Sequence, residues 1–257
     1  MPASNWIWYE LMTSDPDAAR EFYAKVVGFT FEPWPDPAMA GYTIVKTTAG
    51  VGMGGLMKLP DEAAAGGVPP NWGGVVGVAD CDAAVAQAVE LGGKVLAGPF
   101  DIPNVGRYAA LADPAGAAFG VMAMASTGEA GPLPEGPGSV CWRELWTTQP
   151  DTALGYYGAL FGWSESGSMD MGPEGLYRMY KAEGEQALGG VARMMPGQPV
   201  PAWLFYFTVA SVEAAIEATH ANGGKIVMGP HDVPGGGRIA IGIDPQGAAF
   251  AVYAQVG

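Results

Sequence analysis

The chain has 257 residues, of which 49% are apolar and 15% charged, and its formal net charge is −14. A surface this acidic repels phosphate backbones and anionic membranes, so neither nucleic acid nor a membrane is expected as a partner. No apolar run of about 18 residues is free of polar or charged interruption, and none is therefore expected to span a membrane. The first ten residues lack the basic segment and apolar stretch of a secretory signal, which favours a cytoplasmic location.

The first predicted strand covers residues 6–13. Period-two alternation places Trp6, Trp8, Glu10 and Met12 on one face and the residues between them on the other. The face that carries the glutamate is therefore also rich in tryptophan.

A helix is predicted directly after this strand. Asp15 before Pro16 is typical of a helix start, and Gly28 of a helix end. Between them, apolar residues recur with the spacing of a helix that packs on a sheet: Ala19, Phe22, Tyr23, Val26 and Val27.

Three short strands and a second, similar set of elements follow. The strands are predicted at 29–34, 42–47 and 54–59, and a loop rich in Pro and Gly at 60–71. The second set comprises a strand at 72–78, a helix at 80–91, and strands at 94–96, 107–112 and 117–123. Its last two strands are joined by Asp113-Pro114-Ala115-Gly116, whose residue types suit a type I turn.

The chain then repeats itself. Residues 72–123 align with 203–254 without a gap, at an offset of 131, with 23 of 52 positions identical. Upstream, Trp8-x-Glu10-Leu11-x-Thr13 matches Trp142-x-Glu144-Leu145-x-Thr147. We therefore predict an α+β protein with one domain at 1–126, a linker at 127–138 and a second domain at 139–257. Together they contain four βαβββ modules, and any site should occur twice.

The chain resembles the glyoxalase/bleomycin-resistance family of the vicinal-oxygen-chelate superfamily in three features. They are the paired βαβββ modules, the segment from the first strand to the helix-ending glycine, and the closing Asp-Pro-x-Gly hairpin. The resemblance covers nearly the whole chain and is strongest to tandem glyoxalase-like bacterial proteins. It implies open, curved sheets whose concave faces bind small molecules. It also implies a divalent metal held by His or Glu from the first and last strands of each module.

The implied metal-ligand positions do not carry metal-binding side chains. The residues that stand there are Trp8, Trp142, Gly73, Leu204, Gly120 and Ala251. The chain has two histidines: His220 near a predicted helix end and His231 in a predicted loop. Because zinc or nickel needs at least three N, O or S ligands, we expect no metal and no other cofactor.

Glu10 and Glu144 are the candidate catalytic residues. A carboxylate beside tryptophan has its charged form disfavoured by desolvation, which suits a general acid or base. The alternative is a structural brace, in which each glutamate bonds to backbone amides or pairs with a repeated arginine, Glu10 with Arg107 and Glu144 with Arg238.

The candidate ligand-binding residues are large aromatic side chains and arginines that recur in both repeats: Trp8, Trp142, Trp72, Trp203, Arg107 and Arg238. The tryptophans either fill the core or form a stacking wall for a flat ligand. The arginines are either solvated charges at strand ends or forks for a carboxylate or carbonyl group.

The primary hypothesis is a protein that binds a small organic molecule in metal-free, tryptophan-lined cavities. One alternative is a metal-independent lyase or isomerase that uses Glu10 and Glu144 as acid and base. Another is a regulatory or interaction protein with vestigial cavities. Since duplication supplies a second domain within one chain, we expect a monomer with pseudo-twofold repeats, or a weak homodimer.

Overall fold

A computed structural model of the chain describes residues 4–125, 134–194 and 197–256. Part of the predicted linker, residues 127–133, lies outside the described residues, so the predicted domain boundaries stay predictions. None of the described helices is long and apolar enough to cross a membrane.

The first repeat contains two βαβββ modules in the predicted order. Its first module consists of β1 (Trp6–Thr13), α1 (Pro16–Val26), β2 (Thr30–Pro33), β3 (Thr43–Lys46) and β4 (Gly52–Lys58). Its second module consists of β5 (Asn71–Gly77), α3 (Cys81–Glu90), β6 (Lys94–Ile102), β7 (Gly106–Ala112) and β8 (Ala118–Met124). A 3-10 turn (Pro37–Met39) precedes β3.

The second repeat follows the same plan. Its first module consists of β9 (Val140–Thr147), α4 (Pro150–Phe161), β10 (Ser164–Asp170), β11 (Leu176–Lys181) and β12 (Gly189–Arg193). Its second module consists of β13 (Ala202–Thr208), α5 (Val212–Ala221), β14 (Lys225–Val233), β15 (Gly237–Ile243) and β16 (Ala249–Gln255). A 3-10 turn (Gly172–Glu174) precedes β11.

Each repeat forms one eight-stranded sheet, and both sheets are open, as the family resemblance implied. The strand orders are β2-β3-β4-β1-β5-β8-β7-β6 and β10-β11-β12-β9-β13-β16-β15-β14. Within each module the first and last strands are parallel, and the three final strands form an antiparallel meander. Equivalent strands therefore occupy equivalent places in the two sheets.

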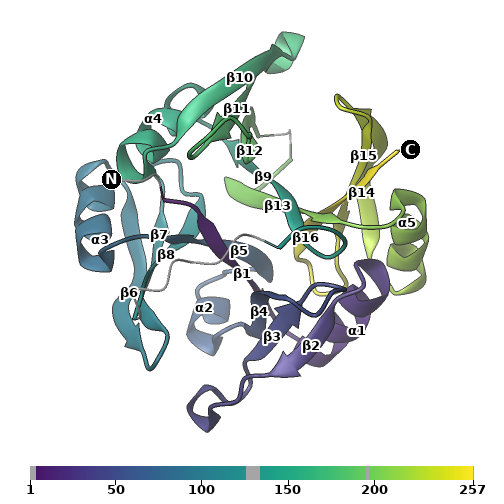
Figure 1. Ribbon diagram of the computed structural model, residues 1–257, viewed down its shortest axis with the longest axis horizontal. Helices are drawn as coiled ribbons and strands as arrows, with labels where there is room; N and C mark the ends of the chain where they lie inside the picture. Colours follow the sequence, from purple (N-terminus) through teal and green to yellow (C-terminus); the bar gives the residue numbers. More distant parts are fainter. Residues whose placement is uncertain (1–3, 126–133, 195–196, 257) are drawn as a thin grey trace. The chain divides into compact units, whose positions relative to one another are not determined.

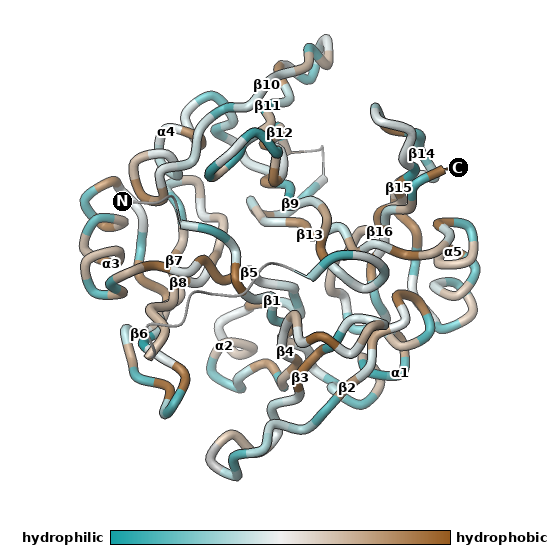
Figure 2. The backbone as a smooth tube through the Cα atoms, in the orientation of Figure 1, coloured by the Kyte–Doolittle hydropathy of each residue, from teal (hydrophilic) through white to brown (hydrophobic). Residues whose placement is uncertain are grey.

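Helices α1 and α3 begin where the sequence predicts them. Asp15, Asp80 and Ser211 each accept a hydrogen bond from the backbone N–H three residues later, which satisfies an otherwise unpaired donor. Figure 2 shows hydrophilic and hydrophobic segments within α1 and α5, as expected of helices with one face on a sheet. The buried face of α1 is made by Ala19, Phe22, Tyr23 and Val26.

Three sequence predictions need correction. The loop predicted at 60–71 contains a short helix, α2 (Asp61–Ala65), whose exposed alanines gave no periodic signal. His231 lies in β14, paired with Ile239, because that strand and β6 run well past the short runs that the sequence pattern marked. Trp6 does not share the half-exposed environment of Trp8: it is 1% exposed and packs on Trp163 and Trp203.

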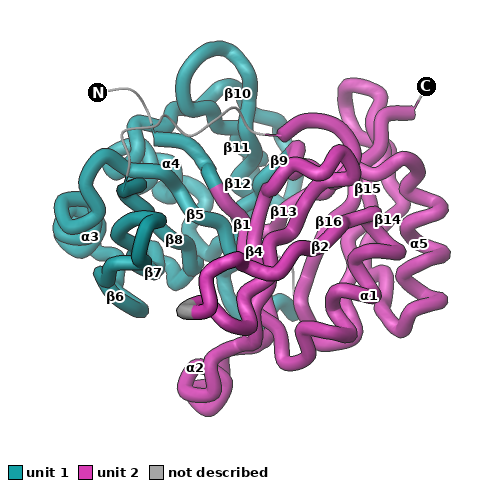
Figure 3. The backbone as a smooth tube through the Cα atoms, turned by 60° about the horizontal axis from the view of Figure 1, so that its bottom comes forward, with its two compact units in different colours: residues 1–7, 73–132, 142–203 teal, residues 8–72, 133–141, 204–257 magenta. Residues whose placement is uncertain are grey.

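The chain divides into two compact units, each built from one module of each repeat. Unit 1 comprises residues 1–7, 73–132 and 142–203, and unit 2 comprises 8–72, 133–141 and 204–257. Within unit 1, α3 packs against α4; within unit 2, α1 packs against α5 (Figures 1 and 3). The sequence repeat and the compact unit thus divide the chain differently.

In unit 2 a buried chain of hydrogen bonds ties the two repeats together. The Trp72 indole N–H donates to the Tyr23 hydroxyl at 2.9 Å, and Tyr23 donates to Asp244 Oδ2 at 3.1 Å. The other oxygen of Asp244 accepts three backbone N–H groups of its own turn, from Gln246, Gly247 and Ala248. A helix of the first repeat is therefore fixed to the closing hairpin of the second.

Unit 1 contains the reciprocal chain. Trp203 donates to Tyr157 at 3.1 Å, and Tyr157 donates to Asp113 Oδ2 at 3.1 Å. We call these two chains the buried relays. Burial raises the pKa of both tyrosines well above the ordinary value, so each remains a proton donor at physiological pH.

Removing the hydroxyl from a relay tyrosine should destabilise the fold. Tyr23→Phe or Tyr157→Phe leaves an indole N–H and a carboxylate oxygen without their partner inside the core, and each should cost about 1–3 kcal/mol. Urea unfolding of each variant measures the loss. Tyr253→Phe is the matched control, because among the described residues the Tyr253 hydroxyl donates to the side chain of Gln255, which is exposed. Wild-type stability in both relay variants would contradict the role assigned to these bonds.

Candidate functional site

The candidate site in the first repeat is a Trp–Tyr–Glu triad on the half-exposed face of β1. The Trp8 indole N–H donates to the Tyr42 hydroxyl at 2.7 Å, and Tyr42 donates to Glu10 Oε1 at 2.8 Å. Trp8, Glu10 and Tyr42 are all partly exposed, whereas the alternate residues Tyr9 and Leu11 are buried. Period-two alternation thus placed Trp8 and Glu10 correctly on one accessible face.

A glycine on the neighbouring strand makes room for this triad. Glu10 is in register with Gly55 of β4, and Gly55 with Ile44 of β3. A Cβ atom at Gly55 would lie 1.9 Å from the Tyr42 hydroxyl and 2.2 Å from the ring carbon that bears it. The tyrosine therefore crosses over a strand position without a side chain to reach the carboxylate.

The second repeat builds the same triad. Trp142 donates to the Tyr177 hydroxyl at 2.8 Å, and Tyr177 is hydrogen-bonded to Glu144. Gly190 is in register with Glu144, and a Cβ atom there would lie 2.1 Å from the Tyr177 hydroxyl. Glu144 itself is buried, with 6% of its surface exposed.

Burial controls the titration of these groups. Desolvation raises the pKa of Glu10 above its ordinary value, and the hydrogen bond from Tyr42 partly offsets this effect. The pKa of Tyr177 is also raised, first by burial and then by the charge of Glu144. A carboxyl group with a raised pKa and a tyrosine donor has the properties of an acid–base residue.

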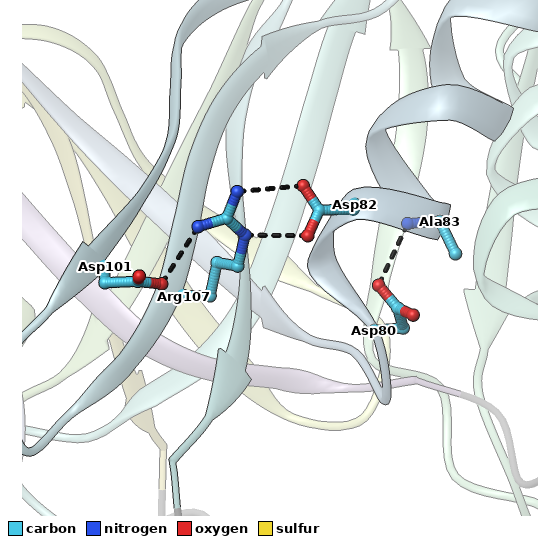
Figure 4. A network of polar contacts seen from close by, with 5 residues as sticks. All are labelled: Asp80, Asp82, Ala83, Asp101 and Arg107. Carbon is cyan, nitrogen blue, oxygen red and sulfur yellow. Dashed lines mark hydrogen bonds and ion pairs between the residues drawn. The ribbon is translucent and has the colours of Figure 1, made fainter.

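The two repeated arginines have carboxylate partners of their own. Arg107 binds Asp82 through two nitrogens, at 2.7 and 3.0 Å, and Asp101 at 2.9 Å (Figure 4). Arg238 binds Asp232 and Glu213, each at 2.7 Å. The side chains of Arg107 and Arg238 are about one-third exposed, at 36% and 35%.

The predicted braces between glutamate and arginine are therefore wrong. The described partner of Glu10 is Tyr42, and that of Glu144 is Tyr177, because both arginines fork onto carboxylates of adjacent helices and strands. Both guanidinium groups already bind carboxylates, which agrees with the alternative that these arginines are charged residues at strand ends. A ligand-binding role for Arg107 and Arg238 stays a prediction.

Trp72 and Trp203 lie in the core. They are 5% and 6% exposed, and their indole N–H groups are engaged in the buried relays. Their surroundings support core filling, and a role as a ligand wall stays a prediction. Of the four predicted tryptophans, Trp8 and Trp142 are the ones beside a candidate glutamate.

Two surface hollows lie apart from the triads. One, of about 380 Å³, lies in unit 1 between the Asp113 turn and the start of α4. The other, of about 270 Å³, lies in unit 2 between the end of α1 and the start of α5. Neither is lined by Glu10, Glu144 or their triad partners, so these hollows do not define the candidate site.

Tyr42 and Tyr177 were not predicted from the sequence. Tyr42 stands just before β3, and Tyr177 lies near the start of β11. The two tyrosines are 135 residues apart, whereas the first strands of the two repeats align at an offset of 134, so the tyrosines do not align in the same frame. The signal that could have found them is the pair of Gly-Gly steps at 54–55 and 189–190, where a strand lacks side chains in both repeats.

Comparison with known proteins gives the family. The model of the Glyoxalase/Bleomycin resistance protein/Dioxygenase superfamily matches residues 7–121 and again 140–252. The chain belongs to this superfamily. The two matches also confirm the duplication and the fold predicted from the sequence.

Relatives at higher identity span nearly the whole chain. A protein of Mycobacterium tuberculosis (strain CDC 1551 / Oshkosh) named "Putative glyoxylase CFP32" is 36% identical over 245 residues, covering 95% of this chain and 92% of that one. The anthracycline biosynthesis protein DnrV of Streptomyces peucetius is 30% identical over 256 residues, covering 95% and 91%.

Solved structures share the superfamily fold at low identity. The Mn(II)-bound glyoxalase from Novosphingobium aromaticivorans matches with a TM-score of 0.67 and 16% identity, over 100% of this chain and 83% of that one. The 2,3-dioxygenase LapB from Pseudomonas sp. KL28 matches with a TM-score of 0.67 and 12% identity, over 99% and 93%.

The residues of this chain do not fit the metal that its superfamily implies. Across the described parts of the chain, no three His, Cys, Asp or Glu side chains lie together so as to hold a metal ion. Trp8 and Trp142 stand at the first-strand positions, and an indole N–H is a donor that cannot ligate a cation. No step through a metal is therefore assigned to this chain.

Filling the space beneath Tyr42 should disconnect the triad. In Gly55→Ala the new methyl group displaces the tyrosine ring, so Glu10 loses its donor and stability falls by about 1–2 kcal/mol. The Trp8 indole N–H resonance should shift with it in an NMR spectrum. Gly155→Ala is the control, because a Cβ atom at this helical position meets nothing within 4 Å. An unshifted Trp8 resonance in Gly55→Ala would refute the steric argument.

The raised pKa of Glu10 predicts a pH-dependent contribution to stability. A carboxyl group that binds its proton more tightly when folded contributes fully below its unfolded pKa of about 4.3, and loses this as pH rises through the folded pKa. The free energy of unfolding of wild type minus that of Glu10→Gln should therefore grow from about pH 8 to about pH 5. Chemical unfolding across this range tests it, with Glu90→Gln on α3 as matched control. A difference that shrinks on acidification would give the opposite sign.

Proposed function

We propose that this superfamily member binds a small organic molecule on the sheet face that carries the Trp–Tyr–Glu triad, without a metal. The observation that carries the proposal is the triad itself. The triad presents a partly exposed carboxylate on a strand face, and an aromatic hydroxyl donates a hydrogen bond to that carboxylate.

The surroundings of Glu10 suit an organic ligand. Ile44, in the same row as Glu10, and the register pair Met12 and Met57 are apolar and only partly buried. An apolar face with one placed polar group is the usual composition of a small-molecule site, and methionine adapts to irregular ligands. The relative named for anthracycline biosynthesis also supports a role in small-molecule chemistry.

A second candidate function is acid–base catalysis of the lyase or isomerase type. The raised pKa of Glu10 and its tyrosine donor favour it, because burial makes this carboxyl group hold a proton more readily than an exposed glutamate does. Glu10 would then remove or return the proton, and Tyr42 would stabilise the carboxylate. The interaction or regulatory hypothesis has no specific observation in its favour. We also propose that the protein is cytoplasmic and acts as a monomer or weak homodimer.

The proposed function predicts binding that survives a chelator. Small aromatic and polycyclic compounds should bind wild type with equal affinity in the presence and absence of EDTA, measured by isothermal titration calorimetry. Glu10→Gln should lower that affinity about tenfold or more, the scale of a hydrogen bond to a charged group. Glu90→Gln should not. If Glu10→Gln abolishes turnover of a bound compound but not its binding, the acid–base function is the correct one. Binding that EDTA abolishes and one equivalent of metal restores would overturn the metal-free proposal.

A further inference from the structure

The two triads differ in one respect that matters for a ligand. Glu10 is partly exposed, whereas Glu144 is 6% exposed, although the hydrogen bonds around them correspond. The residue two positions after each glutamate lies on the same strand face. It is Met12 in the first repeat and the larger Trp146 in the second. The second triad is thus the more enclosed of the two.

The hydrogen bonds of the first triad leave one acceptor free. An indole N–H can only donate, so Tyr42 accepts it and directs its own single proton to Glu10 Oε1. Glu10 Oε2 has no hydrogen-bond partner among the residues that the structure describes. An ionised carboxylate oxygen only accepts, so what binds there must bring a donor.

We infer that each chain has a single ligand site, at Glu10 of the first repeat, which selects molecules that carry a hydrogen-bond donor beside an apolar body, and that the Glu144 triad is structural. This inference rests on the proposed function and narrows it. Duplication by itself predicts two equal sites, and the burial of Glu144 removes one of them. The acidic surface adds to the preference by disfavouring anionic ligands.

Indole and 1-methylindole form a matched pair of probes, because they share a ring system and only indole has an N–H donor. Calorimetry at neutral pH should find one equivalent of indole per chain, bound about tenfold more tightly than 1-methylindole. Glu10→Gln replaces the free acceptor with an amide donor and should abolish the preference. Glu144→Gln should keep the preference and the stoichiometry while lowering the melting temperature. Should Glu10→Gln fail to fold, Glu10→Asp withdraws the carboxylate and should weaken the preference.

The outcomes separate the inference from the function on which it rests. Two equivalents per chain, equal binding of both probes, or an equal loss of preference in Glu144→Gln would overturn the inference and leave small-molecule binding intact. Failure of both probes to bind wild type at about 1 mM would count against both the inference and the proposed function.

Discussion

The buried relays are the constraint on which the rest of the structure depends. In each relay a core tryptophan donates a hydrogen bond to a helix tyrosine, and the tyrosine donates to an aspartate. The other oxygen of that aspartate accepts backbone N–H groups of its own turn. The polar side-chain atoms of a relay therefore satisfy one another, which is the condition for burying such groups without loss. Because the tyrosine belongs to one repeat and the aspartate to the other, this condition is met only when the repeats are assembled. Each compact unit is built around one relay.

The same three kinds of side chain form two hydrogen-bond chains in each compact unit, and in unit 2 the two chains have opposite consequences. Trp72–Tyr23–Asp244 is buried and its carboxylate is fully bonded, so it can only hold the fold together. Trp8–Tyr42–Glu10 lies on a half-exposed face and leaves one carboxylate oxygen without a partner among the described residues. What separates a structural relay from a candidate site is thus the number of donors that reach the carboxylate, together with its exposure. The kinds of side chain are the same: an indole, a phenol and a carboxylate.

The sequence was sufficient for the fold because its signals are local. Strand alternation from Trp8 to Met12, the cap at Asp15 and the Asp113-Pro114 turn each depend on neighbouring residues, and the repeat shows each of them twice. The candidate site was only half predicted. Glu10 and Trp8 lie on one strand, so alternation brought them together, but Tyr42 reaches them across a third strand. That contact depends on register and on the missing side chain at Gly55, which the strand pattern does not reveal. The predicted pairing of Arg107 and Arg238 with the glutamates failed for a related reason. Their partners Asp82 and Glu213 come from helices that pack against the strand, and the strand pattern does not reveal these contacts.

The position that superfamily resemblance assigns to a metal ligand explains how such a site can exist without metal. Trp8 stands there, and it can donate but not coordinate. Its N–H saturates one lone pair of Tyr42 and so directs the tyrosine proton to Glu10. A histidine at the same place could accept that proton and release the carboxylate from its donor. A tryptophan at this position therefore fixes the direction of a hydrogen-bond chain and gives the carboxylate a defined orientation on its strand face. In the proposed function no cation compensates for the carboxylate charge, and the ligand would do so with a hydrogen-bond donor of its own.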